Sequence, residues 1–138
     1  MRLLLTSDLH RDGKKLLWLL DDAPAHDALF VAGDLLDIFS SAGFADQTSG
    51  ALRWRSVILE GGKSFAWCSG NHDFFRGDET PTRGASPLWM HNTTGPDFCV
   101  SDGESRLLST STGQLAVTTV PWPLHDRDVL IDGRPMSY

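Results

Sequence analysis

Three short polar clusters along the chain combine the residue types that bind metal ions. They are Ser7-Asp8-Leu9-His10, Gly33-Asp34-Leu35-Leu36-Asp37 and Ser69-Gly70-Asn71-His72-Asp73. Together they supply carboxylate oxygens, an amide oxygen and imidazole nitrogens. Hard divalent ions prefer oxygen ligands, and imidazole suits manganese, iron, zinc and nickel. Taken together, the clusters predict a metal site, although a lone Gly-Asp is commonly a turn and Asn-His-Asp can be an ordinary polar loop.

The candidate ligands are Asp8, His10, Asp34 and Asn71. Asp8 and His10 are two residues apart, so an extended backbone would point both side chains the same way, toward one ion. The carboxylate of Asp34 has two oxygens and can bridge two ions. Two metals about 3.5–4 Å apart can clamp a phosphoryl group and supply a hydroxide. Gly33 and Gly70 would let the backbone come close to the ions.

Each cluster follows an apolar run that predicts a β-strand, over residues 2–7, 27–33 and 64–68. A helix is predicted over residues 14–21, with Asp12 as its N-cap, and a second over 51–60, ended by Gly61-Gly62. Strand, helix and strand within roughly thirty residues predict parallel strands joined by right-handed crossovers. Open sheets of this kind bind ligands at the carboxyl ends of their strands, where all three clusters fall.

The rest of the chain predicts shorter elements. Residues 38–50 and 76–87 are rich in loop residues. Short strands are predicted over 88–91, 97–100, 106–109 and 114–120, the last of them broken by Pro121-Trp122-Pro123. The tail from residue 124 to 138 has little periodicity.

Composition fits one globular domain of 138 residues with a net charge of −6 and no basic run. This balance argues against a broad phosphate-contacting patch, so nucleic acid is expected only as a possible substrate. A bound metal would offset the acidity locally and leave a phosphate-bearing substrate possible. Cys68 and Cys99 are far apart and predict neither a disulfide nor a zinc-thiolate site. With no signal peptide and no membrane-spanning run, the protein is expected to be cytoplasmic and to have no membrane partner.

The three clusters resemble the first three motifs of the calcineurin-like metallophosphoesterases, over residues 1 to about 75. This resemblance implies an α/β sandwich, two β-sheets flanked by helices, with a dinuclear centre of two divalent ions, Mn, Fe, Zn or Ni. It implies that Asp8 and His10 ligate the first metal, that Asp34 bridges both, and that Asn71 ligates the second. His72 would act on the substrate as proton donor or charge stabiliser. Asp37 would orient His72, or would simply be a helix-start acid stabilised by the helix dipole.

The chain departs from the family's later motifs, a histidine in a strand-end loop and a Gly-His-x-His near the end. His26 is expected on the surface at the opposite end from the site, His91 has no matching context, and His125 could approach the site after the predicted strand. We therefore expect residues 1–138 to form a single metallophosphoesterase-like domain that is incomplete at its C-terminus. By the family pattern the first metal keeps three protein ligands and the second keeps two.

The leading hypothesis is an enzyme that hydrolyses a phosphomonoester or a phosphodiester with metal-activated water. The alternative is a non-catalytic metal-binding or interaction fragment that lacks the C-terminal half of the site. Sheet surface left uncovered would favour self-association. The aromatic candidates for a substrate wall, each of which could instead pack in the core, are Trp54, Phe74, Phe75, Trp89 and Trp122.

Overall fold

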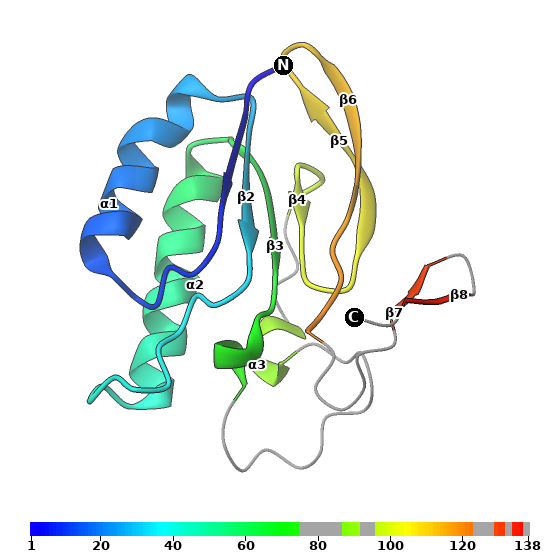
Figure 1. Cartoon of the computed structure of the whole chain (residues 1–138). Coiled ribbons are helices and arrows are strands. Elements are labelled where there is room, and N and C mark those ends of the chain that lie inside the picture. Colours follow the sequence, from blue (N-terminus) through cyan, green and yellow to red (C-terminus); the bar gives the residue numbers. More distant parts are fainter. Residues whose placement is uncertain (75–86, 92–95, 123–128, 132–133, 137–138) are drawn as a thin grey trace.

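The computed structural model describes residues 1–74, 87–91, 96–122, 129–131 and 134–136 (Figure 1). The helices are α1 (Gly13–Asp22), α2 (Phe44–Glu60) and α3 (Leu88–His91), with single 3₁₀ turns at Ala23–Ala25 and Asn71–Asp73. The strands are β1 (Leu3–Thr6), β2 (Ala28–Ala32), β3 (Ser64–Cys68), β4 (Cys99–Val100), β5 (Ser105–Thr110), β6 (Gly113–Thr118), β7 (Val129–Ile131) and β8 (Arg134–Met136).

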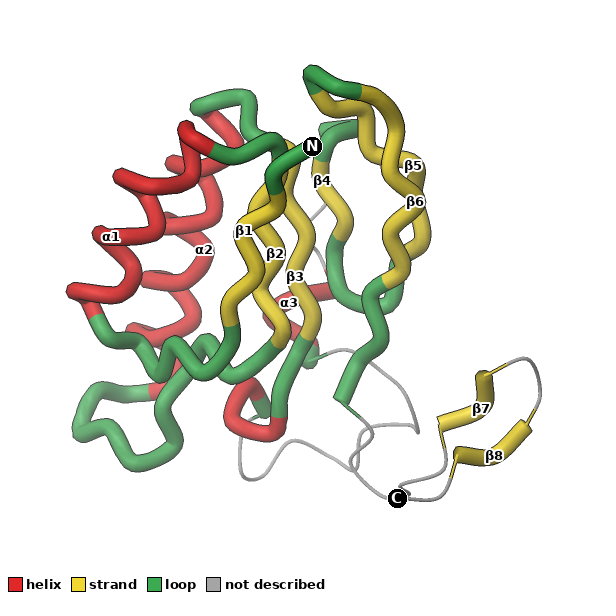
Figure 2. Tube along the Cα trace, turned by 45° about the horizontal axis from the view of Figure 1, so that its top comes forward, coloured by secondary structure: helices red, strands yellow, loops and turns green. Residues whose placement is uncertain are grey.

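The first four strands form one parallel sheet in the order β1-β2-β3-β4. β5 and β6 form an antiparallel hairpin, and β7 and β8 form another. Helices α1 and α2 lie on one side of the parallel sheet and the β5–β6 hairpin lies on the other (Figure 2). The predicted parallel βαβ units are confirmed. The resemblance implied an α/β sandwich of two β-sheets flanked by helices, and the chain has a mixed α/β architecture of this kind, in which the second sheet is antiparallel.

A large core fills the space between the parallel sheet and the two helices. Leu29 from β2 and Phe65 and Trp67 from β3 are fully buried there, against Leu19 of α1 and Ile58 of α2. Asp12 caps α1 as predicted, because its side chain accepts the N–H groups of the first turn. This packing fixes the strands, and therefore fixes where their carboxyl ends lie.

A smaller core joins the opposite face of the sheet to the hairpin. It consists of Ala66, Val100 and Leu108, with Phe30 and Val117 packed against it. Ser64 also donates its hydroxyl to the carbonyl oxygen of Ser109, at 3.0 Å. The hairpin is therefore part of the same folded unit as the sheet.

Helix α2 begins at Phe44, so the loop predicted over residues 38–50 is wrong in its second half. Thr48-Ser49-Gly50 is a loop signal by composition, but Gln47 and Thr48 are buried and α2 continues through them. The side chain of Gln47 bonds to the backbone of the preceding loop, and such tertiary bonds override weak local propensity.

Residues 88–91 are helical, so the strand predicted there is also wrong. The turn starts after Pro87, whose carbonyl oxygen accepts the N–H of Met90 at 2.8 Å. Proline suits the start of a helix because its fixed φ matches the helical value. Met90 is 1% exposed, and Trp89 packs against the helix-side core. Apart from Pro87, the loop predicted over 76–87 lies outside the described residues.

The two cysteines are free, as predicted. His26 precedes β2, at the far end from the site, and is partly buried rather than fully exposed. Its side chain is only 16% exposed and lies 3.5 Å from the carboxylate of Asp22.

Among the described residues, none of the helices has the length and apolar character that a bilayer-spanning segment requires.

Candidate metal centre

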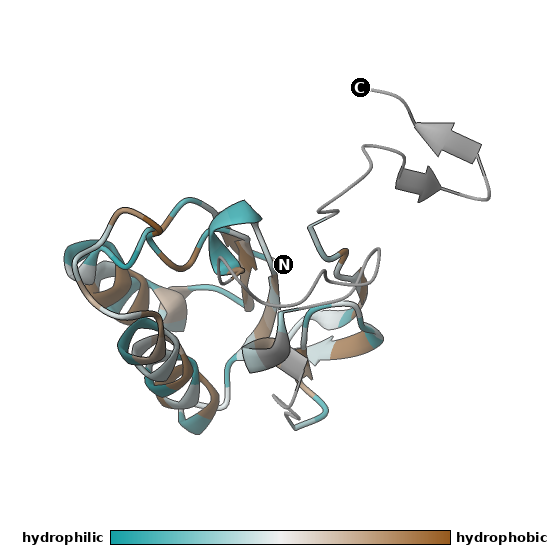
Figure 3. Cartoon of the chain, turned by 90° about the horizontal axis from the view of Figure 1, so that it is seen from below, coloured by the Kyte–Doolittle hydropathy of each residue, from teal (hydrophilic) through white to brown (hydrophobic). Residues whose placement is uncertain are grey.

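The carboxyl ends of β1, β2 and β3 lie side by side at one end of the sheet. Thr6 pairs with Val31, and Ala32 with Cys68, so the three strands end at the same level. Figure 3 views the molecule from this end, with the helices on one side of the sheet and the hairpin on the other. All three polar clusters follow these strand ends directly, as the sequence predicts.

Asp8, His10 and Asp34 come together there. One ligand atom from each lies within 4.8 Å of the other two, close enough to surround one ion. His10 Nε2 is 3.8 Å from Asp8 Oδ1, and the other Asp8 oxygen accepts a hydrogen bond from Ser7 at 2.6 Å. Two carboxylates and an imidazole form a donor set that fits manganese, iron or zinc. The described residues therefore fit a divalent ion at this position.

The ring of His10 is held in the orientation a metal ligand needs. Its Nδ1 lies 3.2 Å from the carbonyl oxygen of Leu36. When Nδ1 donates to that carbonyl, Nε2 keeps its lone pair for an ion. The backbone N–H of His10 donates to the carbonyl of Asp34 at 2.9 Å, so both contacts tie the first cluster to the second.

Three of the four candidate ligands share an unusual backbone conformation. Asp8, His10 and Asp34 have φ angles of 54°, 45° and 54°, in the left-handed region, and Arg11 has 53°. Side-chain-bearing residues seldom adopt this region, and such strain collects at functional sites. The sequence prediction that Asp8 and His10 sit on extended backbone is therefore wrong, although their side chains still meet.

Gly33 and Gly70 are needed because two backbone segments touch. Gly33 has a φ of +80°, and a Cβ there would lie 2.8 Å from the Cα of Gly70. A Cβ on Gly70 would overlap Oδ1 and the backbone nitrogen of Asp34. Only glycine at both positions lets the loops after β2 and β3 pack this closely.

Asp73 is a structural residue of the site that sequence reasoning missed. It is fully buried, and its carboxylate accepts the N–H groups of Gly70 at 2.8 Å and of Asp34 and Leu36 at 3.0 Å. Burial raises the pKa of Asp73 to about 6, against the lowering effect of these donors. Its position directly after Asn-His was the signal that could have found it. Asp73 therefore fixes the position of the second cluster relative to the third.

A second group of potential ligand atoms consists of His10, Asp37 and His72, again within 4.8 Å of one another. The rings of His10 and His72 are 4.4 Å apart, and the His72 backbone N–H donates to Asp34 Oδ1 at 2.9 Å. His72 Nδ1 is buried and has no hydrogen-bond partner among the residues that the structure describes. The imidazole therefore lies beside the candidate ligands with one polar atom unsatisfied.

Asp37 lies near His72, but one of its carboxylate oxygens accepts a hydrogen bond from its own loop. Its Oδ1 accepts the backbone N–H of Phe39 at 2.9 Å. The alternative of a helix-start acid is wrong, because α2 begins seven residues later and its first-turn acid is Asp46.

Asn71 is exposed at the start of the 3₁₀ turn. It lies between Gly70, which packs against Asp34, and His72, which donates its backbone N–H to Asp34.

The loop after β3 is also tied to the C-terminal half of the chain. The Ser69 N–H donates to the carboxylate of Asp102 at 3.0 Å, and Ser69 Oγ accepts the N–H of Trp122 at 3.0 Å. His125 and Phe75 lie outside the described residues, as does the side chain of His91.

The aromatic candidates divide between core and site. Trp54 is 6% exposed and donates to the carbonyl oxygen of Leu16, and Trp89 donates to that of Asp73 at 2.8 Å. Both are packing residues. Phe74 is buried but lines a pocket beside His72, whereas Trp122 is 45% exposed.

Comparison with protein families identifies the class. The family model described as calcineurin-like phosphoesterase matches residues 1–132, so the chain belongs to the calcineurin-like phosphoesterases. No curated protein and no solved structure matches the chain. The family is one of metal-dependent hydrolases of phosphoester bonds, in accord with the donor set at the strand ends.

Proposed function

We propose that the chain is a hydrolase of phosphomonoesters or phosphodiesters that works at a centre of two divalent ions. The observation that carries this proposal is the convergence of Asp8, His10 and Asp34 within 4.8 Å at the carboxyl end of a parallel sheet. Asn71 completes the proposed ligand set. Bound divalent ions would neutralise the phosphoryl oxygens and provide the water-derived nucleophile at neutral pH.

The chain's own residues would divide the remaining work. Asp34 would contact both ions, since its carboxylate stands between the first and third clusters. His72 would donate a proton to the leaving oxygen or stabilise charge on the phosphoryl group. Asp37, close to His72, would orient the imidazole and so support either role.

Hydrolysis of bis(p-nitrophenyl) phosphate and of p-nitrophenyl phosphate tests the proposal, with added Mn²⁺ and with a chelator. We expect metal-dependent release of nitrophenolate that the chelator abolishes. Asp34→Asn keeps an oxygen to accept the His72 N–H but removes the charge. Activity should fall at least about 100-fold, because mutating a residue that only hydrogen-bonds to a metal ligand already costs up to about 100-fold.

The matched control is Asp21→Asn, which removes the same charge from an exposed position on α1. It should leave the rate unchanged. Metal binding without hydrolysis of either ester would instead support the alternative function, a non-catalytic metal-binding domain. Hydrolysis that survives chelation would contradict both.

A further inference from the structure

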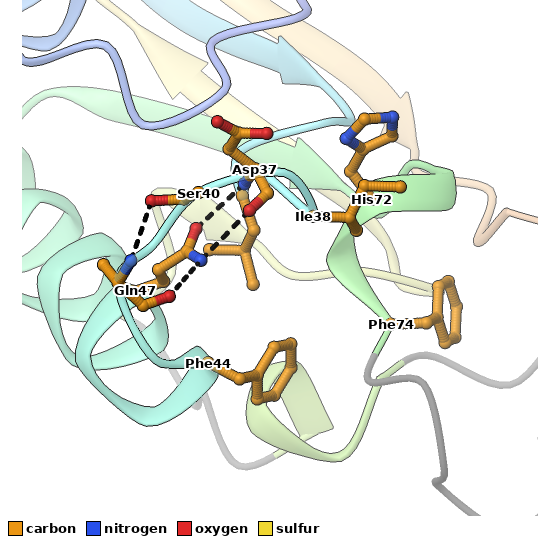
Figure 4. A pocket seen from close by; sticks show the side chains of 9 residues that line it. Asp37, Ile38, Ser40, Phe44, Gln47, His72 and Phe74 are labelled. Carbon is orange, nitrogen blue, oxygen red and sulfur yellow. Dashed lines mark hydrogen bonds between the residues drawn. The ribbon is translucent and has the colours of Figure 1, made fainter.

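A pocket of about 210 Å³ opens beside the candidate centre. Its lining combines the loop after β2, the start of α2 and the segment after β3, and the residues are Leu36, Asp37, Ile38, Ser40, Ala42, Phe44, Gln47, His72 and Phe74. Phe44 from α2 and Phe74 stand on opposite sides of it (Figure 4). The volume suits one ring: an apolar cavity of about 150 Å³ accepts benzene, whereas pockets for larger ligands start near 300 Å³.

The pocket is continuous with the candidate centre through two shared residues. His72 and Asp37 line the pocket and also belong to the group of ligand atoms that includes His10. A phosphoryl group held at the centre would therefore carry one of its ester substituents toward the pocket. This continuity is what identifies the occupant as part of the substrate.

Asp37 and His72 lie on the side of the pocket next to the candidate centre, whereas the polar side chains of the remaining wall, Gln47 and Ser40, already bond to the loop backbone. Gln47 donates to the carbonyl oxygens of Asp37 and Ala42 and accepts the Asp37 N–H at 2.9 Å. Ser40 Oγ accepts the N–H of Ala42 at 3.2 Å. Along this wall, away from Asp37 and His72, a sugar or another hydroxyl-rich group would lose more hydrogen bonds to water than it could replace, which is costly. An apolar ring has no hydrogen bonds to water to lose.

Resting on the proposed phosphoesterase function, we infer that this pocket selects phosphate esters that carry one aromatic ring, and that Ile38, Ala42 and Phe44 determine this preference. The ring lies between the two phenylalanines, with the phosphoryl group beside His72. Small alkyl esters and sugar phosphates leave the pocket filled with water and are the poorer substrates.

Calorimetric titration of the Mn²⁺-loaded chain with two non-hydrolysable phosphonates tests this inference without relying on turnover. Benzylphosphonate has the shape of phenyl phosphate, and ethylphosphonate has the same charged group without the ring. We expect benzylphosphonate to bind about tenfold tighter or more, the factor that follows from burying a ring of this size. Ala42→Phe, which fills the pocket, should abolish the difference and leave ethylphosphonate binding unchanged.

The matched control is Ala45→Phe, the same substitution at an exposed position of α2 outside the pocket. It should retain the preference for the ring. If Ala42→Phe does not fold, Ile38→Ser provides a second test, since Ile38 is 37% exposed and its replacement should reduce the preference. Equal binding of the two phosphonates by the unmodified chain would overturn the pocket's role and leave the phosphoesterase proposal intact. Binding of neither would overturn both.

Discussion

At the scale of single residues, His72 differs from the metal ligands in what its loss should do. His72→Ala keeps the backbone N–H that donates to Asp34 and removes only the ring. We expect bound metal, measured by elemental analysis, to be retained while hydrolysis falls by about 10²–10⁴-fold, the usual contribution of general acid–base catalysis. A parallel loss of metal and rate would make His72 a ligand.

Asp73 is the residue on which the geometry of the site depends most. Asp73→Ala leaves the buried N–H groups of Asp34, Leu36 and Gly70 without their acceptor. Each unsatisfied group costs about 1–3 kcal/mol, so we expect the free energy of unfolding in urea to fall by about 3 kcal/mol or more. Asp21→Ala removes an exposed carboxylate and should change it little. A loss as small as that of the control would mean that the loops pack without Asp73.

Residue types and spacing were enough to predict which side chains meet, but not how the backbone brings them together. Asp8 and His10 were found from Asp-x-His, yet their left-handed φ angles come from bonds to the loop after β2. The pairing of Gly33 with Gly70 and the bonds of Asp73 to Asp34 and Leu36 join distant segments. Such contacts leave no local pattern in the sequence.

At the scale of elements, one side chain fixes the loop between β2 and α2. Gln47 forms three hydrogen bonds with the backbone of that loop. We expect Gln47→Ala to lower the free energy of unfolding by about 1–3 kcal/mol, and to weaken binding of ring-bearing phosphonates more than of ethylphosphonate. Gln114→Ala, at an exposed position of β6, is the control and should change neither. Unchanged ligand preference in a folded Gln47→Ala variant would separate the loop from the pocket.

Gln47 also explains one of the places where the prediction of elements failed. The strands β1 to β6, α1 and the end of α2 follow from apolar periodicity and capping residues, and the structure agrees with them within a few residues. The hairpin of β7 and β8 was missed, because it lies in the tail where no periodicity predicted an element. The first two turns of α2 and the short α3 depend on Gln47 and on the packing of Met90 and Trp89. Loop-rich composition or a short apolar run could not reveal either.

At the scale of the whole molecule, the parallel pairing of β1, β2 and β3 was predictable, because strands joined through a helix run parallel with right-handed crossovers. The position of the β5–β6 hairpin was not, because its strands were assigned as elements without partners. The hairpin packs against Ala66 of β3 and Val100 of β4. Strand β4 forms one edge of the parallel sheet. In the part of the chain that the structure describes, β1 forms the opposite edge.

The outer edge of β1 gives the last prediction, which concerns self-association. Leu3 and Leu5 are 44% and 69% exposed, and they point away from the helix layer, because Leu4 between them packs into the helix-side core. An edge strand with exposed apolar side chains favours pairing with another copy. We expect concentration-dependent association in sedimentation experiments, reduced by Leu5→Lys. Leu17→Lys, the same substitution at a leucine 64% exposed on α1, should leave it unchanged. A chain that stays monomeric at high concentration, or two variants with equal effect, would show that this edge does not drive association.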